Sequence, residues 1–102
     1  MHKIKNSKAY QTRRLQDLVS VGPAALQDFA LLGIKTIDEL ADKKAHLLYQ
    51  RLCWITEKQH DPCVEDVFSA AIAQAQNPDL PAEECQWWYW SRKRKQPNET
   101  NK

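Results

Sequence analysis

The chain of 102 residues has only two glycines and three cysteines, and it contains no long apolar run. A membrane-spanning helix needs about 20 consecutive apolar residues, so we expect no membrane span. The first eight residues, Met-His-Lys-Ile-Lys-Asn-Ser-Lys, lack the apolar stretch of a secretory signal. Three irregularly spaced cysteines do not suit a disulfide framework and indicate reduced thiols. We therefore expect a cytoplasmic protein.

Length and composition favour one compact helical domain. Apolar residues make up 42% of the chain, which is near the globular average, and glycine is too scarce for a repeat or a disordered protein. We predict a flexible basic N-terminus at 1–7, a helical domain at 8–91 and a basic, polar, disordered tail at 92–102. The net charge is only +2, so the distribution of the charges must indicate any nucleic-acid surface.

The chain from Leu15 to Leu40 has the pattern of two helices joined by a tight turn. Ser7 can cap a first helix over 8–18, and Val19–Val21 is long enough only for a short connection. Gly22 and Pro23 suit the N-cap and the first position of the second helix.

The second helix is predicted to run to Leu32. Gly33 can close it in the left-handed conformation. Thr36 and Glu39 then form a capping box that opens another short helix.

Three further helices follow in the pattern. The first spans Ala45–Glu57 with Asp42 as its cap, and the second begins at Asp61–Pro62 and ends before Asn77. A short helix from Ala82 to about Trp90 has Pro81 at its first position. We therefore predict an all-α bundle of five to six helices.

The turn and its flanks carry a resemblance to a known motif. The stretches concerned are Val21-Gly22-Pro23-Ala24, Leu32-Gly33-Ile34, Asp38-Glu39-Leu40, Leu48–Cys53, His60–Phe68 and Trp87–Trp90. They resemble the bacterial pathogenicity-locus family of helix-hairpin-helix proteins, whose members often carry the label mitomycin resistance protein. The first half is also similar to the C-terminal domain of TfoX-type competence regulators. The resemblance implies one helix-hairpin-helix (SAM-like) unit.

That resemblance also implies DNA binding without base recognition. The backbone amides of Ser20, Val21 and Gly22 would hold a phosphate at a helix start, where the helix dipole favours an anion. This chain departs from the family pattern, because Ser20 replaces the first hairpin glycine and Pro23 removes one amide donor. The second helix carries no Lys or Arg, so the nearest cations are those outside it: Arg13, Arg14 and Lys35. A purely structural hairpin is the alternative.

The C-terminal region places four aromatic residues beside a basic run. Trp88 and Trp90 could stack on bases while phosphates meet the cations Arg92, Lys93, Arg94 and Lys95. In the alternative interpretation, two tryptophans cover the core and the basic run only keeps the tail soluble.

Cys53, His60 and Cys63 are the candidate metal ligands, with Cys85 distant from them. Zinc takes thiolate and imidazole ligands, but no Cys-x-x-Cys pair is present and Cys53 fits the core, so we predict no metal and no other cofactor. Cys63 near a helix start, with His60 close by, also suggests a thiol of lowered pKa. No third, orienting group is identifiable, so we predict that the protein is not an enzyme.

Two function classes remain. One is a DNA-associating domain that contacts phosphates through the hairpin and the basic termini. The other is an adaptor that docks another protein through the hairpin and the exposed C-terminal aromatics. The two differ in salt dependence, because release of counterions from phosphates makes DNA affinity fall linearly with log salt. The oligomeric state is not indicated by the sequence.

Overall fold

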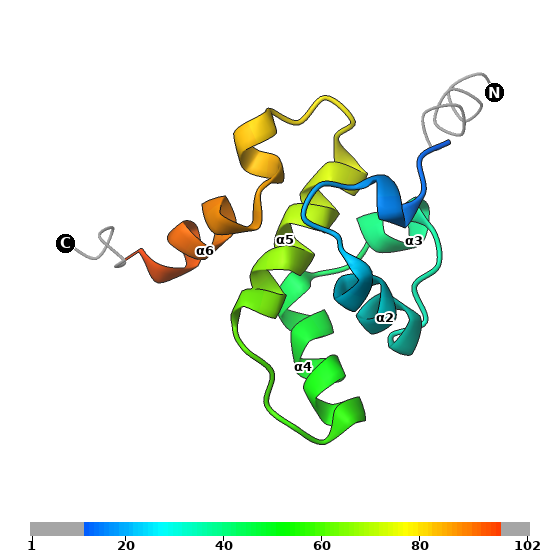
Figure 1. Ribbon diagram of the computed structural model, residues 1–102, viewed down its shortest axis with the longest axis vertical. Coiled ribbons are helices and arrows are strands. Elements are labelled where there is room, and N and C mark those ends of the chain that lie inside the picture. The colour runs from blue at the N-terminus through cyan, green and yellow to red at the C-terminus, as the bar shows by residue number, and fades with distance from the viewer. Residues whose placement is uncertain (1–11, 97–102) are drawn as a thin grey trace.

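A computed structural model describes residues 12–96, and within them the chain is helical and contains no strand. Five α-helices and two short 3-10 turns follow one another (Figure 1). They are η1 (Leu15–Asp17), α2 (Pro23–Leu31), α3 (Ile37–Ala41), α4 (Ala45–Thr56), α5 (Cys63–Gln76), η2 (Ala82–Cys85) and α6 (Trp87–Lys95). The predicted all-α fold class is confirmed, and none of the described helices meets the length and apolarity that a membrane crossing requires.

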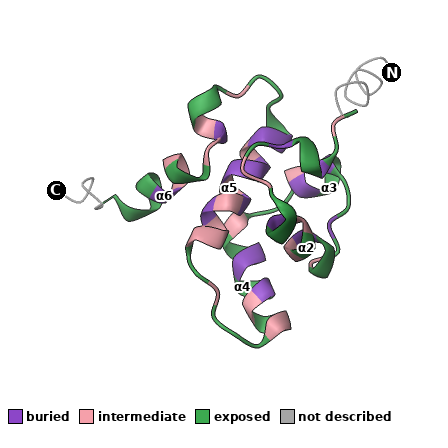
Figure 2. Cartoon of the chain, viewed as in Figure 1, coloured by how far each residue is buried: buried purple, intermediate pink, exposed green. Residues whose placement is uncertain are grey.

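Helix α5 is the centre of the fold. It packs against α2, α3, α4, α6 and η2, and it runs through the middle of the molecule as a largely buried rod (Figure 2). Phe68 of α5 and Phe29 of α2 are fully buried, with ring centroids 5.4 Å apart. Leu40 and Leu52 add side chains from α3 and α4 to the same core. Burial of apolar surface on four helices is the main stabilising term.

The predicted start of α2 and its closure at Gly33 are confirmed, but the helix ends at Leu31 and not at Leu32. Gly22 is the N-cap residue and Pro23 is the first helical residue. At the other end Gly33 has φ +79°, which a glycine adopts without steric cost. The amide of Gly33 donates to Ala30 O (3.1 Å) and that of Ile34 to Phe29 O (2.9 Å). These two bonds make a Schellman motif, which satisfies the last carbonyl groups of the helix.

The capping box of α3 is also confirmed. Thr36 Oγ1 accepts a hydrogen bond from Glu39 N (3.1 Å), and Glu39 Oε1 accepts one from Thr36 N (3.2 Å). Glu39 Oε1 also accepts from Lys35 N (2.7 Å). These bonds lower the pKa of Glu39 below its usual 4.5, because they favour the ionised carboxylate.

Helices α4 and α5 lie where the apolar periodicity predicts them. The prediction of Asp42 as the cap of α4 was wrong. Asp42 is the C-cap of α3, and Lys44 is the N-cap of α4. At the start of α5, Asp61 Oδ1 accepts from Cys63 N (2.8 Å). The predicted start is therefore one residue early: Pro62 is the N-cap and Cys63 the first helical residue, and Asp61 bonds the helix start from the position before the cap.

The predicted helix over 8–18 is wrong in its described part. Residues 8–11, like the predicted segment at 1–7 and the Ser7 cap, lie outside the described residues. Thr12–Arg14 are not helical, and only the 3-10 turn η1 forms. Asp17 Oδ2 accepts from Arg14 N (2.7 Å) and closes this single turn. Leu18 then takes an extended conformation with ψ 141°, which stops further helix growth.

The C-terminal prediction also needs correction. The single helix over 82–90 is divided into η2 and α6 at Gln86, whose ψ is 137°. Helix α6 continues to Lys95, so the boundary predicted at 92 falls inside a helix. The basic run is therefore helical and belongs to the domain, whereas residues 97–102 lie outside the described part.

Candidate nucleic-acid interface

Three of the predicted phosphate-binding cations border one groove. Arg13 and Arg14 come from the segment before η1, and Lys35 comes from the loop before α3. The groove encloses about 400 Å³, and its lining residues are Arg13, Arg14, Leu15, Gln16, Leu26, Lys35, Thr36, Ile37 and Asp38. Leu26 lies at the end of the first turn of α2, so the groove reaches the start of that helix.

The cations of the groove differ in exposure. The Arg14 side chain is 71% exposed, and its Nε lies 4.0 Å from Asp17 Oδ2. Lys35 is also exposed. Arg13, predicted on the solvent side, is only partly exposed because its Nη1 donates to Gln74 O (2.9 Å). One acidic residue, Asp38, also borders the groove, so positive charge predominates along its wall.

The turn before α2 is tied to the C-terminal part of the chain. Ser20 has φ +74°, the left-handed conformation that a glycine takes readily. Its Oγ donates to Cys85 O (3.0 Å) and accepts from Trp87 N (3.0 Å), so it serves as a cap for α6 from a distant part of the chain. The serine hydroxyl is therefore occupied by the fold and is not available to a ligand.

Gln74 of α5 fixes the residue before this turn. Its Oε1 accepts from Val19 N (2.9 Å), and its Nε2 donates to Val19 O (2.9 Å) and to Ala70 O (3.1 Å). Gln74 is buried, and it replaces the hydrogen bonds that the irregular backbone at Val19 lacks. The turn is thus held rigidly on α5.

Two of the three predicted phosphate-binding amides, those of Val21 and Gly22, differ in their hydrogen bonding. Val21 N donates to Leu18 O (3.3 Å), so this amide is used inside the turn. Gly22 lies exposed at the N-cap of α2, and no side chain caps that end of the helix. Gly22 has φ −104°, and a Cβ built there meets no atom within 4 Å. The accessible end of α2 is therefore centred on Gly22, and its amide has no partner among the described residues.

Arg94, predicted to bind nucleic acid, instead forms a bond within the fold. Its Nε donates to Asp66 Oδ1 (2.8 Å) and its Nη2 to Asp66 Oδ2 (2.9 Å). Asp66 is 1% exposed, so this two-pronged ion pair holds α6 on α5. The carboxylate raises the pKa of Arg94 above its usual value, since it stabilises the charged guanidinium. Arg94 is not a free cation.

The other cations of α6 lie close to aromatic rings. Arg92 lies over the Trp88 ring at 5.0 Å, with its Nη2 3.4 Å from Glu83 Oε2. Lys93 Nζ lies 6.0 Å from the Trp90 ring centroid, and the Trp90 indole donates to Glu84 O (2.8 Å). Trp88 is 40% exposed. The aromatic residues of α6 are therefore partly packed and partly exposed. This is compatible both with base stacking and with a role in covering the core.

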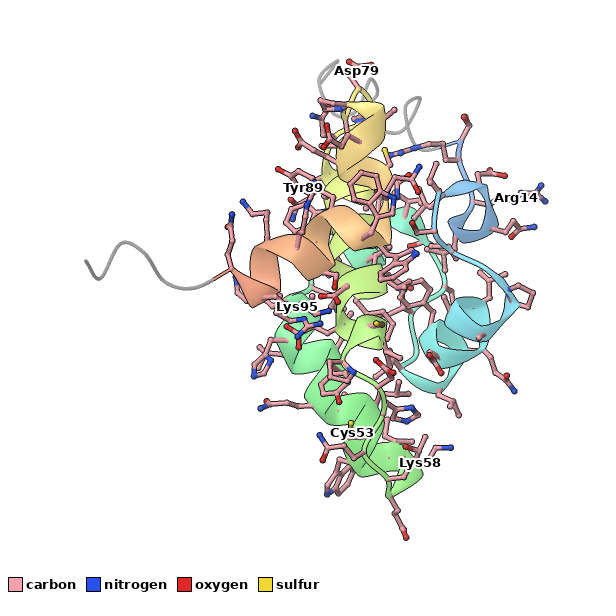
Figure 3. All side chains as sticks on the ribbon, turned by 60° about the vertical axis from the view of Figure 1, so that its left-hand side comes forward. Arg14, Cys53, Lys58, Asp79, Tyr89 and Lys95 are labelled. Atoms are coloured by element: carbon pink, nitrogen blue, oxygen red, sulfur yellow. The ribbon has the colours of Figure 1, made fainter. Side chains whose placement is uncertain are left out.

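The two sets of cations do not converge on one surface. Arg14 projects on one side of the molecule, whereas Tyr89 and Lys95 project on the opposite side (Figure 3). The groove and the basic run of α6 are therefore separate clusters, and a ligand that spans both must wrap around the domain.

The cysteine hypotheses are not supported by the geometry. Within residues 12–96, no three His, Cys, Asp or Glu side chains gather in a way that could hold a metal ion, so Cys53, His60 and Cys63 are not a ligand set. The expected lowering of the Cys63 pKa was wrong. The hydrogen bond to the Asp61 carboxylate, with burial, raises the pKa of Cys63 above its usual 9.0, because it disfavours the thiolate.

Several residues with a clear place in the structure were not predicted from the sequence. Asp66 and Gln74 are buried on α5, eight residues apart and in line with Ala70. This i, i+4, i+8 spacing beside an apolar stripe was the signal that could have identified them. Leu47 and Trp54, 58% and 78% exposed on α4, were also missed. Large apolar side chains on the polar side of an amphipathic helix were the signal there.

Comparisons with known proteins give two matches. A sequence model of the family described as Cdd1, pathogenicity locus, matches residues 8–96. The chain is also similar to the mitomycin resistance protein McrB of Streptomyces lavendulae. The two are 35% identical over 81 residues, which are 79% of this chain and 73% of that protein. No solved structure gives a significant match.

Proposed function

This chain belongs to the pathogenicity-locus family, and we propose that it is a non-catalytic helix-hairpin-helix protein that binds DNA without base specificity. The observation that carries this proposal is the groove shared by Arg13, Arg14 and Lys35. Cations from two separate segments border one surface that extends to the first turn of α2. Such a surface suits phosphates, which carry one negative charge per nucleotide and no sequence information.

The proposed contact uses the side chains and the end of α2 together. Arg14 and Lys35 are exposed, so the Arg14 guanidinium can donate two hydrogen bonds to a phosphate and Lys35 can act as a point charge. At the N-terminus of α2, the exposed Gly22 allows close approach of a phosphate, and the helix dipole adds attraction. Arg13 supports this wall through its bond to Gln74 O. With about two or three phosphates neutralised, affinity would be modest and strongly salt-dependent.

A second candidate is an adaptor that uses the hairpin and the C-terminal aromatic residues. Trp87 and Trp88, 39% and 40% exposed, favour it because Trp87 is bonded to Ser20 of the hairpin. Arg92 already covers the Trp88 ring, and the Trp90 indole is bonded to Glu84. Less aromatic surface is thus available there than the sequence suggested, so we place DNA binding first.

Fluorescence anisotropy with a labelled 20-base-pair duplex of arbitrary sequence, titrated at several salt concentrations, tests DNA binding. We expect log affinity to fall linearly with log salt and the slope to decrease by about 1 for Arg14→Gln and again for Lys35→Gln. Gly22→Leu should weaken binding while the domain stays folded, because a side chain at this exposed position meets open space.

Arg51→Gln is the matched control, since it removes one exposed cation from α4, outside the groove. It should leave the salt slope unchanged. Equal effects of Arg14→Gln and Arg51→Gln would indicate attraction by net charge alone and would contradict a groove site. A duplex affinity without salt dependence, or no affinity at low salt, would contradict DNA binding altogether.

A further inference from the structure

Helix α4 presents an apolar pair to solvent that folding does not explain. Leu48, Tyr49 and Leu52 bury the inner face of this helix in the core. On the outer face, Leu47 is 58% exposed and Trp54 is 78% exposed. A tryptophan gains nothing for folding at such a position, where a polar residue would be better solvated. Two large apolar side chains exposed on one helix face therefore form a candidate interaction surface.

The spacing of this pair matches that of a helix-binding seam. Leu47 and Trp54 are seven residues apart, which is two turns and a rise of about 10 Å along α4. Helix recognition uses apolar anchors at positions i, i+3, i+4 and i+7, and Leu47 and Trp54 occupy the i and i+7 positions. Arg51 lies between them, four residues after Leu47 and three before Trp54. The outer face of α4 therefore alternates an apolar, a cationic and an apolar group.

The charges around the pair select for an acidic occupant. Lys43 and Lys44 precede the helix and are exposed, as is Arg51. Within residues 12–96 none of these three cations forms an ion pair with a carboxylate. Glu57, at the C-cap, is the acidic residue of the outer end. Cations thus predominate at the start and in the middle of the seam.

We propose that the outer face of α4 binds an acidic amphipathic helix of another protein. Apolar side chains of the partner would pack on Leu47 and Trp54, and its carboxylates would lie against Lys44 and Arg51. Two apolar anchors cannot supply the about 800 Å² per partner of a stable interface between globular proteins, so a short segment fits better than a second copy of this chain.

Nucleic acid is the less suitable occupant of this face. Bases stack on aromatic rings, but Leu47 has no ring, and the exposed Glu57 repels phosphates. The seam is therefore independent of the proposed DNA groove, which lies among η1, α2 and α3 and contains no residue of α4.

The test uses the ¹⁵N-labelled full chain and a lactam-bridged helical peptide of three heptads. The peptide carries Leu at positions a and d and Glu at positions e and g, and a second peptide has Lys in place of Glu. We expect the Glu peptide to shift amide signals over residues 44–57. Trp54→Ala should weaken its binding about 30-fold, since a central tryptophan carries much of the affinity of such an interface. Arg51→Glu should abolish the preference for the Glu peptide, because it leaves Lys43 and Lys44 balanced by two carboxylates.

Arg14→Glu makes the same charge change outside the seam and should leave peptide binding unchanged. Circular dichroism checks that Trp54→Ala is folded, which its exposure predicts. Equal binding of the two peptides, signals shifted elsewhere, no binding, or displacement of the peptide by oligothymidine would each overturn the proposal. Trp54→Ala should leave the salt dependence of duplex binding unaltered, so failure of the seam and failure of the DNA groove are distinguishable.

Discussion

Arg94→Ala is expected to lower the free energy of unfolding of the domain by a large fraction. Arg94 donates two hydrogen bonds of 2.8 and 2.9 Å to Asp66, which is 1% exposed. The substitution leaves this carboxylate buried without its charge partner. Loss of one member of a buried pair costs about 3–5 kcal/mol. Because the Arg94 side chain is 31% exposed, water can reach the site, and we expect the lower end, about 3 kcal/mol.

Urea denaturation followed by circular dichroism measures this change in the free energy of unfolding. Arg92→Ala is the matched control, since Arg92 belongs to the same basic run and its side chain is 65% exposed. Its pair with Glu83 is on the surface, so we expect a loss of about 0–1 kcal/mol. Against a total stability of about 5–15 kcal/mol, the contrast between the two variants is readily measured.

A double variant separates the two contributions of the pair. Asp66→Leu combined with Arg94→Met removes both charges and keeps apolar volume, so we expect stability within about 1 kcal/mol of the original chain. Similar losses for Arg94→Ala and Arg92→Ala would refute the reasoning. That result would mean that α6 is held by its aromatic residues and that the ion pair contributes little.

Three further predictions concern the turn and the titratable groups. Ser20→Ala should cost about 1 kcal/mol more than Ser20→Gly in urea denaturation, because both lose the hydroxyl but only alanine is strained at φ +74°; equal costs would contradict this. Burial raises the pKa of Asp28, so ionisation of this carboxyl destabilises the folded state as pH rises. Asp28→Asn should therefore increase the free energy of unfolding at pH 7 but not at pH 3. No gain at pH 7 would refute this prediction. The Asp61 carboxylate raises the pKa of the Cys63 thiol. Asp61→Asn should therefore speed alkylation of Cys63 by iodoacetamide at pH 8. A thiol that titrates below 9.0 in the wild-type chain would contradict this prediction.

The local features of the fold could be predicted from sequence because their physical cause is local. Gly22 and Pro23 start α2, and Gly33 ends it with φ +79°. The bonds between Thr36 and Glu39 join residues three apart. Each of these signals depends on backbone geometry and a neighbour in the same turn, so no knowledge of the tertiary structure was needed.

The features that failed depend on distant partners. The division between η2 and α6 is accompanied by the bond from Trp87 N to Ser20 Oγ, which no local pattern encodes. In the sequence, Arg94 cannot be distinguished from the other cations of its run, because its partner Asp66 lies on a different helix. The groove forms because η1 and the loop before α3 lie together in the fold. The sequence indicated Arg13, Arg14 and Lys35 as cations near the turn, but not that they border one groove.

The bond between Ser20 and Trp87 has a consequence for how the chain folds. These residues are 67 positions apart, so the N-terminal turn obtains its final partner only after most of the chain has been synthesised. Closing so long a loop carries an entropic cost that must be met before the contact stabilises anything. During translation the turn can therefore dock on Gln74 once α5 has formed, whereas the amide of Trp87 becomes protected from hydrogen exchange by Ser20 only after α6 has emerged.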